Sequence, residues 1–348
     1  MRLPRRSYAT ITRMLLPGMF IVASAACAAH APPPAAPLAP AAPPAPAATM
    51  PPAPPPAPVQ PAARGKGAMT PISIMRPLAS RGDVRIDDGA GSIRVVAWDK
   101  AAVQVTGDQP SAAKAPVVDS SPDRFSLRIR AKVQHCWFIF ACSQSLLPVH
   151  LTVYVPRAAS VTLRSISAGQ SVQGVQGSRV DLDSVSGALE LLQSDFATAR
   201  MHSISGTIRV DGRVGRLAAD DVSGDVRAPL SDCSQAQVTT ISGEINLGCG
   251  SVSDLEIKSV SGDATLAVAG LLRGGRIAIN TVSGDAHLVV PSDVSARLDL
   301  GSVSGSVGGA LPANVTVHGH HVTGRFGTGD GSIHAGTVSG DIQLQQRR

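Results

Sequence analysis

The chain has 348 residues, a hydrophobic fraction of 43%, 34 glycines and 27 prolines, yet only 3% of its residues are aromatic. A large α/β enzyme core normally uses more Phe, Tyr and Trp, whereas short stacked strands can be built from Val, Ile, Leu, Ser and Gly. The net charge of +6 gives no argument for a nucleic-acid partner, because beyond the first 26 residues 27 basic residues face 25 acidic ones.

Residues 1–28 have the order of a secretory signal peptide. Arg2, Arg5, Arg6 and Arg13 form a positive region, an apolar run follows from Met14 to Ala26, and small residues surround Cys27. The apolar run is too short to span a bilayer stably. We therefore expect an exported protein located in the periplasm, in the outer membrane or at the cell surface.

Cys27 leaves two processing routes open. A cysteine after small residues at the end of an apolar run resembles a bacterial lipoprotein site, where that residue is lipidated. Ordinary cleavage after Ala28 fits about as well, because Ser24 stands where a lipoprotein signal prefers an aliphatic residue. Contact with a membrane is expected only through such a lipid anchor.

Residues 29–71 form an expected linker, and from Ala31 to Ala63 almost every residue is Ala or Pro. Proline fixes φ and has no N–H, so this tract cannot build a sheet. We expect a semi-rigid spacer that extends by about 3 Å per residue.

Residues 72–160 are expected to form less regular β structure that caps the repeats. Four stretches alternate as strands do: Ser92–Ala97, Ala102–Thr106, Phe125–Ile129 and Val149–Val155. Terminal units of a repeat protein are usually atypical, and a cap blocks pairing at an open sheet end.

Residues 161–348 repeat a short motif. Val-Ser-Gly or Ile-Ser-Gly occurs at Ser186, Ser205, Ser223, Ser242, Ser261, Ser283, Ser304 and Ser339, Val322-Thr323-Gly324 is a ninth copy, and Ser167 marks a degenerate first one. Such a period predicts an all-β, β-helix-like solenoid of about ten rungs of about 19 residues. Each glycine is expected to supply a corner with positive φ. A polar residue two positions before each serine should form a ladder: Ser184, Ser203, Asp221, Thr240, Ser259, Thr281 and Ser302.

The stretch Gly91–Asp99, the segment Leu151–Arg157 and the Val-Ser-Gly-Asp repeats together resemble the bacterial putative-adhesin family. That family is a β-strand-repeat domain of unknown function on exported and envelope proteins. The resemblance covers residues 83–346 and implies adhesion, with no catalytic residues to transfer. The Ala/Pro tract and the insert at 136–142 are not part of its pattern.

Four cysteines follow Cys27, and an even number in an exported chain indicates disulfides. The local pairings are favoured: Cys136 with Cys142, and Cys233 with Cys249. A zinc site is the alternative, although no Cys-x2-Cys spacing occurs. The insert between Cys136 and Cys142 is rich in aromatics and predicts either a plug over the solenoid end or an apolar contact patch.

Acidic residues follow the glycine in consecutive repeats, at Asp225, Glu244, Asp263 and Asp285. Gly-Asp is ordinary turn chemistry, and a divalent-cation ladder is the weaker alternative, because carboxylates suit Ca²⁺. No cofactor is expected.

The repetitive surface predicts a non-catalytic envelope or surface module, an adhesin or scaffold whose partner is an envelope protein or a surface glycan. A carbohydrate-active β-helix enzyme is one alternative, which needs a non-repeating cluster of unlike groups. An envelope-stress sensor that signals through a protein partner is the other.

Overall fold

The computed structural model describes residues 69–111, 113–129, 132–138, 141–311 and 314–347. These residues form 23 strands and no helix, so none of the described segments could cross a membrane as a helix. The all-β fold expected from the sequence is confirmed. The expected signal peptide, Cys27 and the expected linker as far as residue 68 lie outside the described residues.

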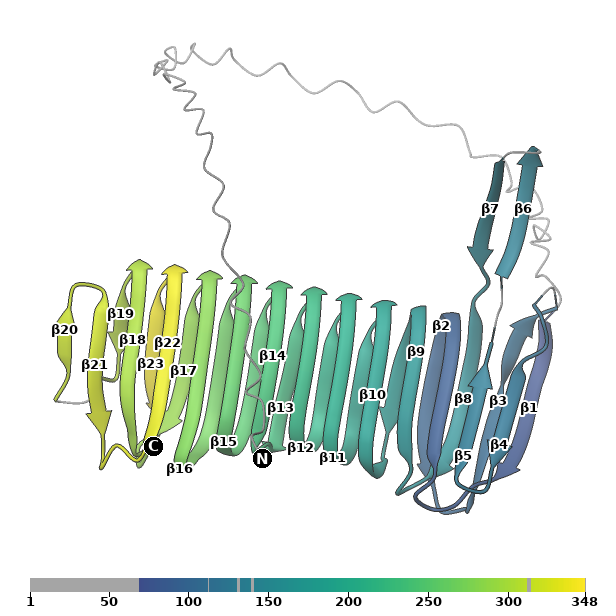
Figure 1. Cartoon of the computed structure of the whole chain (residues 1–348), viewed down its shortest axis with the longest axis horizontal. Helices are drawn as coiled ribbons and strands as arrows, with labels where there is room; N and C mark the ends of the chain where they lie inside the picture. Colours follow the sequence, from purple (N-terminus) through teal and green to yellow (C-terminus); the bar gives the residue numbers. More distant parts are fainter. Residues whose placement is uncertain (1–68, 112, 130–131, 139–140, 312–313, 348) are drawn as a thin grey trace, which may run out of the picture. The chain divides into compact units, whose positions relative to one another are not determined.

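The strands fall into three groups along the chain (Figure 1). The first group is β1 (Met69–Pro77), β2 (Asp83–Trp98), β3 (Ala102–Pro110), β4 (Val117–Ser121), β5 (Arg124–Arg128), β6 (Lys132–Phe138), β7 (Ala141–Leu146) and β8 (Val149–Pro156). The second is β9 (Ser160–Gln173), β10 (Gln176–Ser186), β11 (Leu189–Ser205), β12 (Ile208–Ser223), β13 (Val226–Asp232), β14 (Gln235–Ser242), β15 (Ile245–Ser261) and β16 (Ala264–Ser283). The third is β17 (Ala286–Pro291), β18 (Ala296–Ser304), β19 (Val307–Gly309), β20 (Thr316–His318), β21 (His321–Phe326), β22 (Gly331–Ser339) and β23 (Ile342–Arg347).

The second group is a stack of parallel strands, as a solenoid requires. The ladders pair Ser186 of β10 with Ser205 of β11, and Ser205 with Ser223 of β12. The same register continues through the serines of β14, β15 and β16, which are Ser242, Ser261 and Ser283. Neighbouring strands of a sheet lie about 4.8 Å apart. The serines of the repeat therefore form one row along the stack, as the period predicts.

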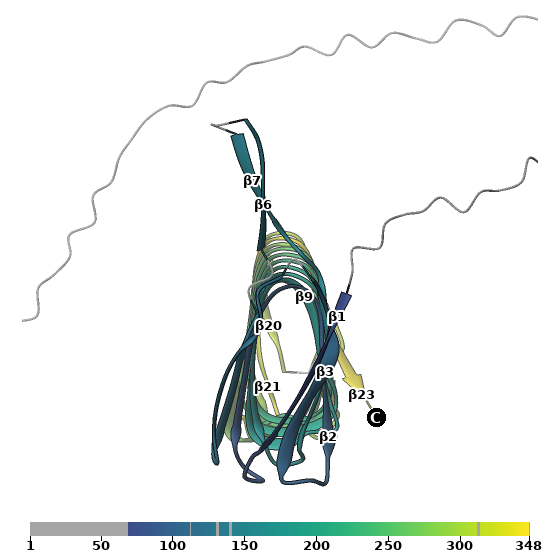
Figure 2. The same cartoon turned by 90° about the vertical axis from the view of Figure 1, so that its right-hand side faces the viewer.

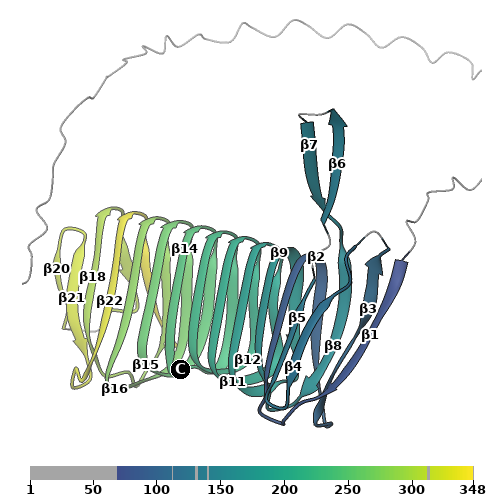
Figure 3. The ribbon, with the colours of Figure 1, turned by 45° about the vertical axis from the view of Figure 1, so that its right-hand side comes forward.

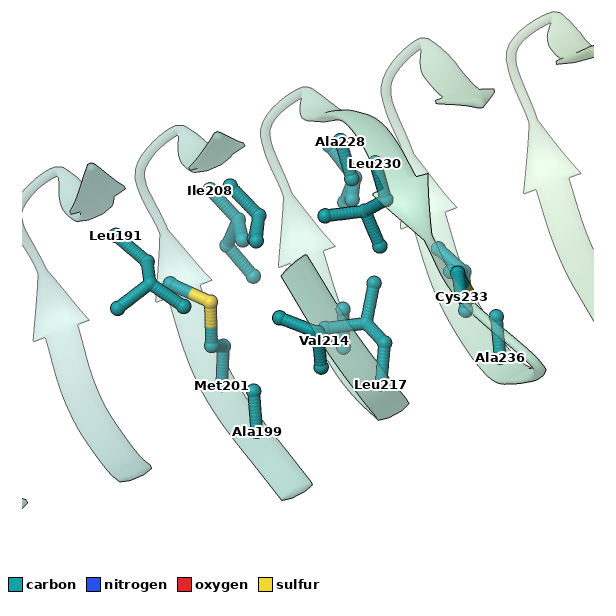
Figure 4. Close-up of a cluster of buried hydrophobic side chains, with 14 of the residues drawn as sticks. Leu191, Ala199, Met201, Ile208, Val214, Leu217, Ala228, Leu230, Cys233 and Ala236 are labelled. Carbon is teal, nitrogen blue, oxygen red and sulfur yellow. The ribbon is translucent and has the colours of Figure 1, made fainter. Parts of the chain in front are cut away.

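Alternation of inward and outward side chains makes these segments strands. In β10, Val180 and Leu182 are fully buried, while Asp181 and Asp183 are partly exposed. Leu182 pairs with Met201 of β11, so apolar side chains stack from one rung to the next. Figure 4 shows Met201 among buried side chains of neighbouring rungs, and Figure 2 shows the successive strands around a flattened interior. Full burial of one such side chain contributes about 1.5–3 kcal/mol.

The corner glycines are needed for two different reasons. Gly243 has a φ of +145°, which residues with a side chain rarely adopt. A Cβ on Gly243 would also lie 2.1 Å from the carbonyl oxygen of Gly224 in the preceding rung. Gly224 has no positive φ, yet a Cβ there would lie 2.1 Å from the oxygen of Gly206. The expectation of a positive φ at every corner is wrong, because the close approach of the rungs by itself excludes a side chain at Gly224.

At the C-terminal end the rungs do not stack in sequence order. β22 pairs with β16 through Ser339 and Ser283, and with β18 through Ser339 and Ser304. β23 likewise pairs with both β17 and β19. The last strands of the chain are therefore inserted between two rungs that precede them in the sequence.

The expected ninth copy, Val322-Thr323-Gly324, is not a corner of the stack. It lies in β21, which pairs antiparallel with β18 and with β20 (Figure 3). Reading it as a repeat was wrong, since a tripeptide match does not fix the direction of its strand. The hairpin of β20 and β21 instead covers the side of β18 that faces away from β22.

At the other end, β2 belongs to the parallel stack although it contains no Val-Ser-Gly. It pairs with β9 along its length, with Asp88 opposite Ser165 and Gly91 opposite Ala168. On its other side β2 pairs with β5 and β8. An early strand is thus inserted between later ones here too, and the stack continues across the expected boundary at residue 160.

Antiparallel strands lie outside this N-terminal stack. β3 pairs with β8, β1 pairs with β3, and β4 pairs with β5, all antiparallel. β1 begins at Met69, so the last three residues of the expected linker are strand. β6 and β7 form a separate two-stranded sheet and pair only with each other, so strand pairing gives no support to the insert as a plug.

Candidate functional site

The candidate site is the corner at which each repeat turns from one strand to the next. β10, β11, β12, β14, β15, β16, β18 and β22 all end at the serine of the motif, side by side (Figure 1). Because the rungs are in register, each position of the motif forms its own row along the stack. Four rows matter: a buried polar ladder, an aliphatic row, the glycines, and an acidic row.

The polar ladder lies beneath the corner and is confirmed. Ser184 pairs with Ser203, Ser203 with Asp221, and the register continues through Thr240, Ser259 and Thr281. These side chains are 0–5% exposed. The Thr281 hydroxyl donates to the carbonyl oxygen of Gly284 at 3.2 Å, which ties the strand end to the turn after it. Ser302, the last member expected, lies beside Thr337 because of the inserted β22.

Two carboxyl groups occupy ladder positions. Asp88 is 5% exposed, and its Oδ1 accepts the Gly89 N–H at 2.7 Å. Burial raises the pKa of Asp88 to about 7. Burial also raises the pKa of Asp221, against hydrogen bonds from the Val222 and Ser223 N–H groups. Asp88 belongs to β2 and Asp221 to β12, with the strands of β9, β10 and β11 stacked between them.

The aliphatic residue before each serine points to solvent, which sequence reasoning missed. We call this row the apolar ridge: Ile166, Val185, Ile204, Val222, Ile241, Val260, Val282, Val303 and Val338, with exposed fractions of 36–73%. The available signal was parity. Residues 184 and 189 point inward, and the four residues between them leave the turn at 185–188 outside. Repeated aliphatic side chains on a surface mark an interaction site more often than scattered ones do.

The acidic row lies beside the ridge, and its aspartates link neighbouring rungs. Asp225 Oδ1 accepts the N–H of Glu244 at 3.1 Å, and Asp263 Oδ1 accepts that of Asp285 at 2.8 Å. Asp285 in turn accepts the N–H of Asp341 at 2.8 Å. These contacts are the turn chemistry expected for Gly-Asp. Within the described part of the chain, no three or more His, Cys, Asp or Glu side chains are grouped so that they could hold a metal ion.

Asp341 ends this row. Its Oδ1 accepts both the N–H and the hydroxyl of Ser306, at 2.8 and 2.9 Å. These hydrogen bonds lower the pKa of Asp341. The row therefore follows the spatial order of the rungs, with Asp341 between Asp285 and Ser306.

The cysteines lie as the local pairings require. Cys233 and Cys249 are buried thiols in contact, and the hydrogen bond to Cys233, together with burial, raises the pKa of Cys249. Figure 4 shows Cys233 in the row of buried side chains. The ladder of β6 and β7 places Cys136 opposite Cys142. Both disulfides stay predictions.

The sequence matches the Toastrack DUF4097 family model over residues 82–345. The chain belongs to this family. The resemblance to putative adhesins of unknown function is thereby confirmed, because the matched segment contains the strand of Gly91–Asp99 and the serine repeats. A comparison with curated proteins gives no match.

Solved structures with a similar course of the chain come from gut bacteria. A putative adhesin from Bacteroides fragilis is 9% identical, with 80% of this chain and 98% of that chain covered and a TM-score of 0.46. A putative lipid binding protein from Parabacteroides distasonis is 14% identical over 79% and 96% of the two chains, with a TM-score of 0.39. A putative adhesin from Parabacteroides merdae is 10% identical over 82% and 98%, with a TM-score of 0.35. Since each TM-score is below 0.5, membership of the family rests on the sequence match.

Proposed function

We propose that this protein is a non-catalytic surface module of the bacterial cell envelope, an adhesin or scaffold that binds its partner along the apolar ridge. One observation carries the proposal: the aliphatic residue of every repeat is exposed in the same row. Folding does not require this, because a polar residue would fill the exposed corner at lower cost in water. Nine such positions form a continuous strip.

The rows define the chemistry of the partner. A strip of Val and Ile beside Asp225, Glu244, Asp263 and Asp285 suits a surface with apolar side chains flanked by Lys or Arg. An envelope protein offers both, and we propose it as the partner. A surface glycan is the second candidate partner, although aliphatic side chains lack the aromatic faces on which sugars usually stack.

A catalytic role has less support. An enzyme needs unlike groups that converge at one point, usually with perturbed pKa values. The two carboxyl groups with raised pKa values, Asp88 and Asp221, are each buried and lie in different rungs. An envelope-stress sensor remains compatible with the ridge, since a sensor also needs a protein partner.

We further propose that the chain is exported, with residues 1–28 as its signal peptide and residues 29–68 as a spacer before the strands. Lipidation of Cys27 would attach the solenoid to a membrane, and cleavage after Ala28 would release it to the periplasm or surface. The antiparallel strands β1, β3 and β4, and the hairpin of β20 and β21, serve in this proposal as caps that prevent the stack from pairing end to end with other sheets.

The test is binding of the labelled full-length protein to bacterial envelope preparations. We expect a variant with Val222→Ser, Ile241→Ser and Val260→Ser to bind at least about tenfold more weakly, because three neighbouring apolar contacts are lost. The matched control replaces exposed apolar residues outside the ridge, with Met75→Ser, Leu272→Ser and Val317→Ser. Equal binding by the two variants would overturn the ridge as the binding surface. Release of soluble sugar from the preparations by the unaltered protein would favour the enzyme instead.

A further inference from the structure

A groove on the outward face of the N-terminal strands is lined by four arginines and two aspartates. The arginines are Arg85, Arg124, Arg128 and Arg179, and the aspartates are Asp83 and Asp119. The groove encloses about 510 Å³, within the range of small-molecule sites, about 300–1,000 Å³. It is separate from the repeat corner, because none of the ridge residues lines it.

Strand register brings these residues together from distant parts of the sequence. Arg85 of β2 lies opposite Ser126 of β5 on one side and opposite Thr162 of β9 on the other. Asp83 lies opposite Arg124 in the ladder of β2 and β5. The centre of the groove is thus one arginine between two hydroxyl groups.

The charges around this centre are not balanced. The Nε atoms of Arg85 and Arg128 both lie near Asp87 Oδ2, at 3.3 and 3.6 Å, so two guanidinium groups share one carboxylate. Arg124 forms no ion pair with any side chain that the structure describes. Arg85 and Arg128 keep 41% and 49% of their side chains exposed, so their remaining N–H groups are open to a ligand.

This set of groups fits one class of ligand. Guanidinium groups bind carboxylate or phosphate through paired hydrogen bonds. The Asp119 carboxylate accepts hydrogen bonds from hydroxyl groups, and the Ser126 and Thr162 hydroxyls both donate and accept. A ligand that carries acidic groups and many hydroxyls would use all of them. We propose that the groove binds an acidic saccharide, whose carboxylate or phosphate group lies against Arg85, Arg124 and Arg128.

The test measures binding of short oligogalacturonate to the full-length protein by titration calorimetry, with the methyl-esterified oligosaccharide as the neutral counterpart. We expect the acidic form to bind and the ester to bind at least about tenfold more weakly, since the ester cannot pair with guanidinium groups. Arg124→Gln should weaken binding of the acidic form by about tenfold. The matched control is Arg297→Gln, an exposed arginine of β18 outside the groove.

Several outcomes would overturn the proposal. Equal binding of the acidic and esterified forms would show that charge is not recognised. Equal losses in Arg124→Gln and Arg297→Gln would indicate attraction to net charge alone. Competition by inorganic phosphate at the same concentration as the oligosaccharide would leave an anion site and remove the saccharide. The ridge variant should bind the acidic form normally, so failure here and failure of the proposed function are separate results.

Discussion

Ser339 lies directly between Ser283 and Ser304 in the parallel ladder, although both of those serines precede it in the chain. The C-terminal strands β22 and β23 are consequently interior parts of the stack. Leu344 of β23 is fully buried and pairs with Leu288 on one side and Gly309 on the other. A strand in that position should contribute to global stability, whereas a terminal strand of a solenoid frays.

We therefore expect Leu344→Ala to lower the free energy of unfolding by about 2–5 kcal/mol, the usual range for truncating a buried leucine. Urea unfolding of the full-length protein measures this. Gln345→Ala, on the exposed face of the same strand, is the control and should cost less than about 0.5 kcal/mol. A small effect of Leu344→Ala would mean that β23 does not lie between two rungs.

The corner glycines give a second prediction, because the contact at Gly243 is with backbone and cannot be relieved by a rotamer change. Gly243→Val should destabilise the protein by more than about 2 kcal/mol, since it adds strain at φ +145° and a clash with the Gly224 oxygen. Gly308→Ala is the control, because no atom lies within 4 Å of a Cβ placed there. Thermal unfolding of both variants compares them, and similar melting temperatures would contradict the close approach of the rungs.

The polar ladder gives a prediction about pH. The pKa of Asp88 is about 7 in the folded protein, against 3.8 as the model value for the exposed group. Between these values the folded state holds the proton more tightly than the unfolded state. Stability should therefore fall as pH rises from about 4 to about 7, by at most about 1.4 kcal/mol per pH unit from this group.

Asp88→Asn removes this titration but keeps an oxygen acceptor for the Gly89 N–H. Urea unfolding across this pH range should show the unaltered protein losing stability relative to Asp88→Asn as pH rises. If the difference between the two proteins stayed constant with pH, the pKa of Asp88 would not be raised.

Binding along the ridge should be distributed over many rungs. Replacing Asp225, Glu244, Asp263 or Asp285 singly with its amide should change partner binding by less than about threefold, since exposed charges contribute about 0.2–1 kcal/mol each. The amide also keeps the acceptor that links each aspartate to the next rung. Envelope binding and the melting temperature test this together. A single amide variant that lost binding while keeping its melting temperature would instead point to a discrete metal or catalytic site.

The disulfide prediction concerns protein prepared from an oxidising compartment. The contact of the Cys233 and Cys249 thiols, and the cross-strand position of Cys136 and Cys142, place each predicted pair together. We expect thiol titration of denatured, non-reduced periplasmic protein to find no reactive thiol among these four. Finding two or more would refute the pairing, and the same titration after reduction is the control.

The sequence by itself determined the regular part of this protein. Every rung of a parallel stack repeats the same environment, so the same residue types recur at the same spacing. For that reason the serine register from Ser186 to Ser283, the buried ladder from Ser184 to Thr281 and the corner position of Gly243 could all be predicted from the letters. Local alternation also identified the inward-facing residues of β10.

Only the tertiary structure decided what happens where the repetition ends. The period says that units stack, but the free energy of stacking does not depend on chain order when the connections are long enough, so the insertion of β22 between β16 and β18 has no local signature. β2 joins the stack with Asp88-Gly89-Ala90-Gly91 in place of the motif, and Val322-Thr323-Gly324 has the motif but lies in an antiparallel hairpin. The arginine groove arises in the same way, because Arg85, Arg124 and Arg179 become neighbours only through the pairing of strands that are far apart in the sequence.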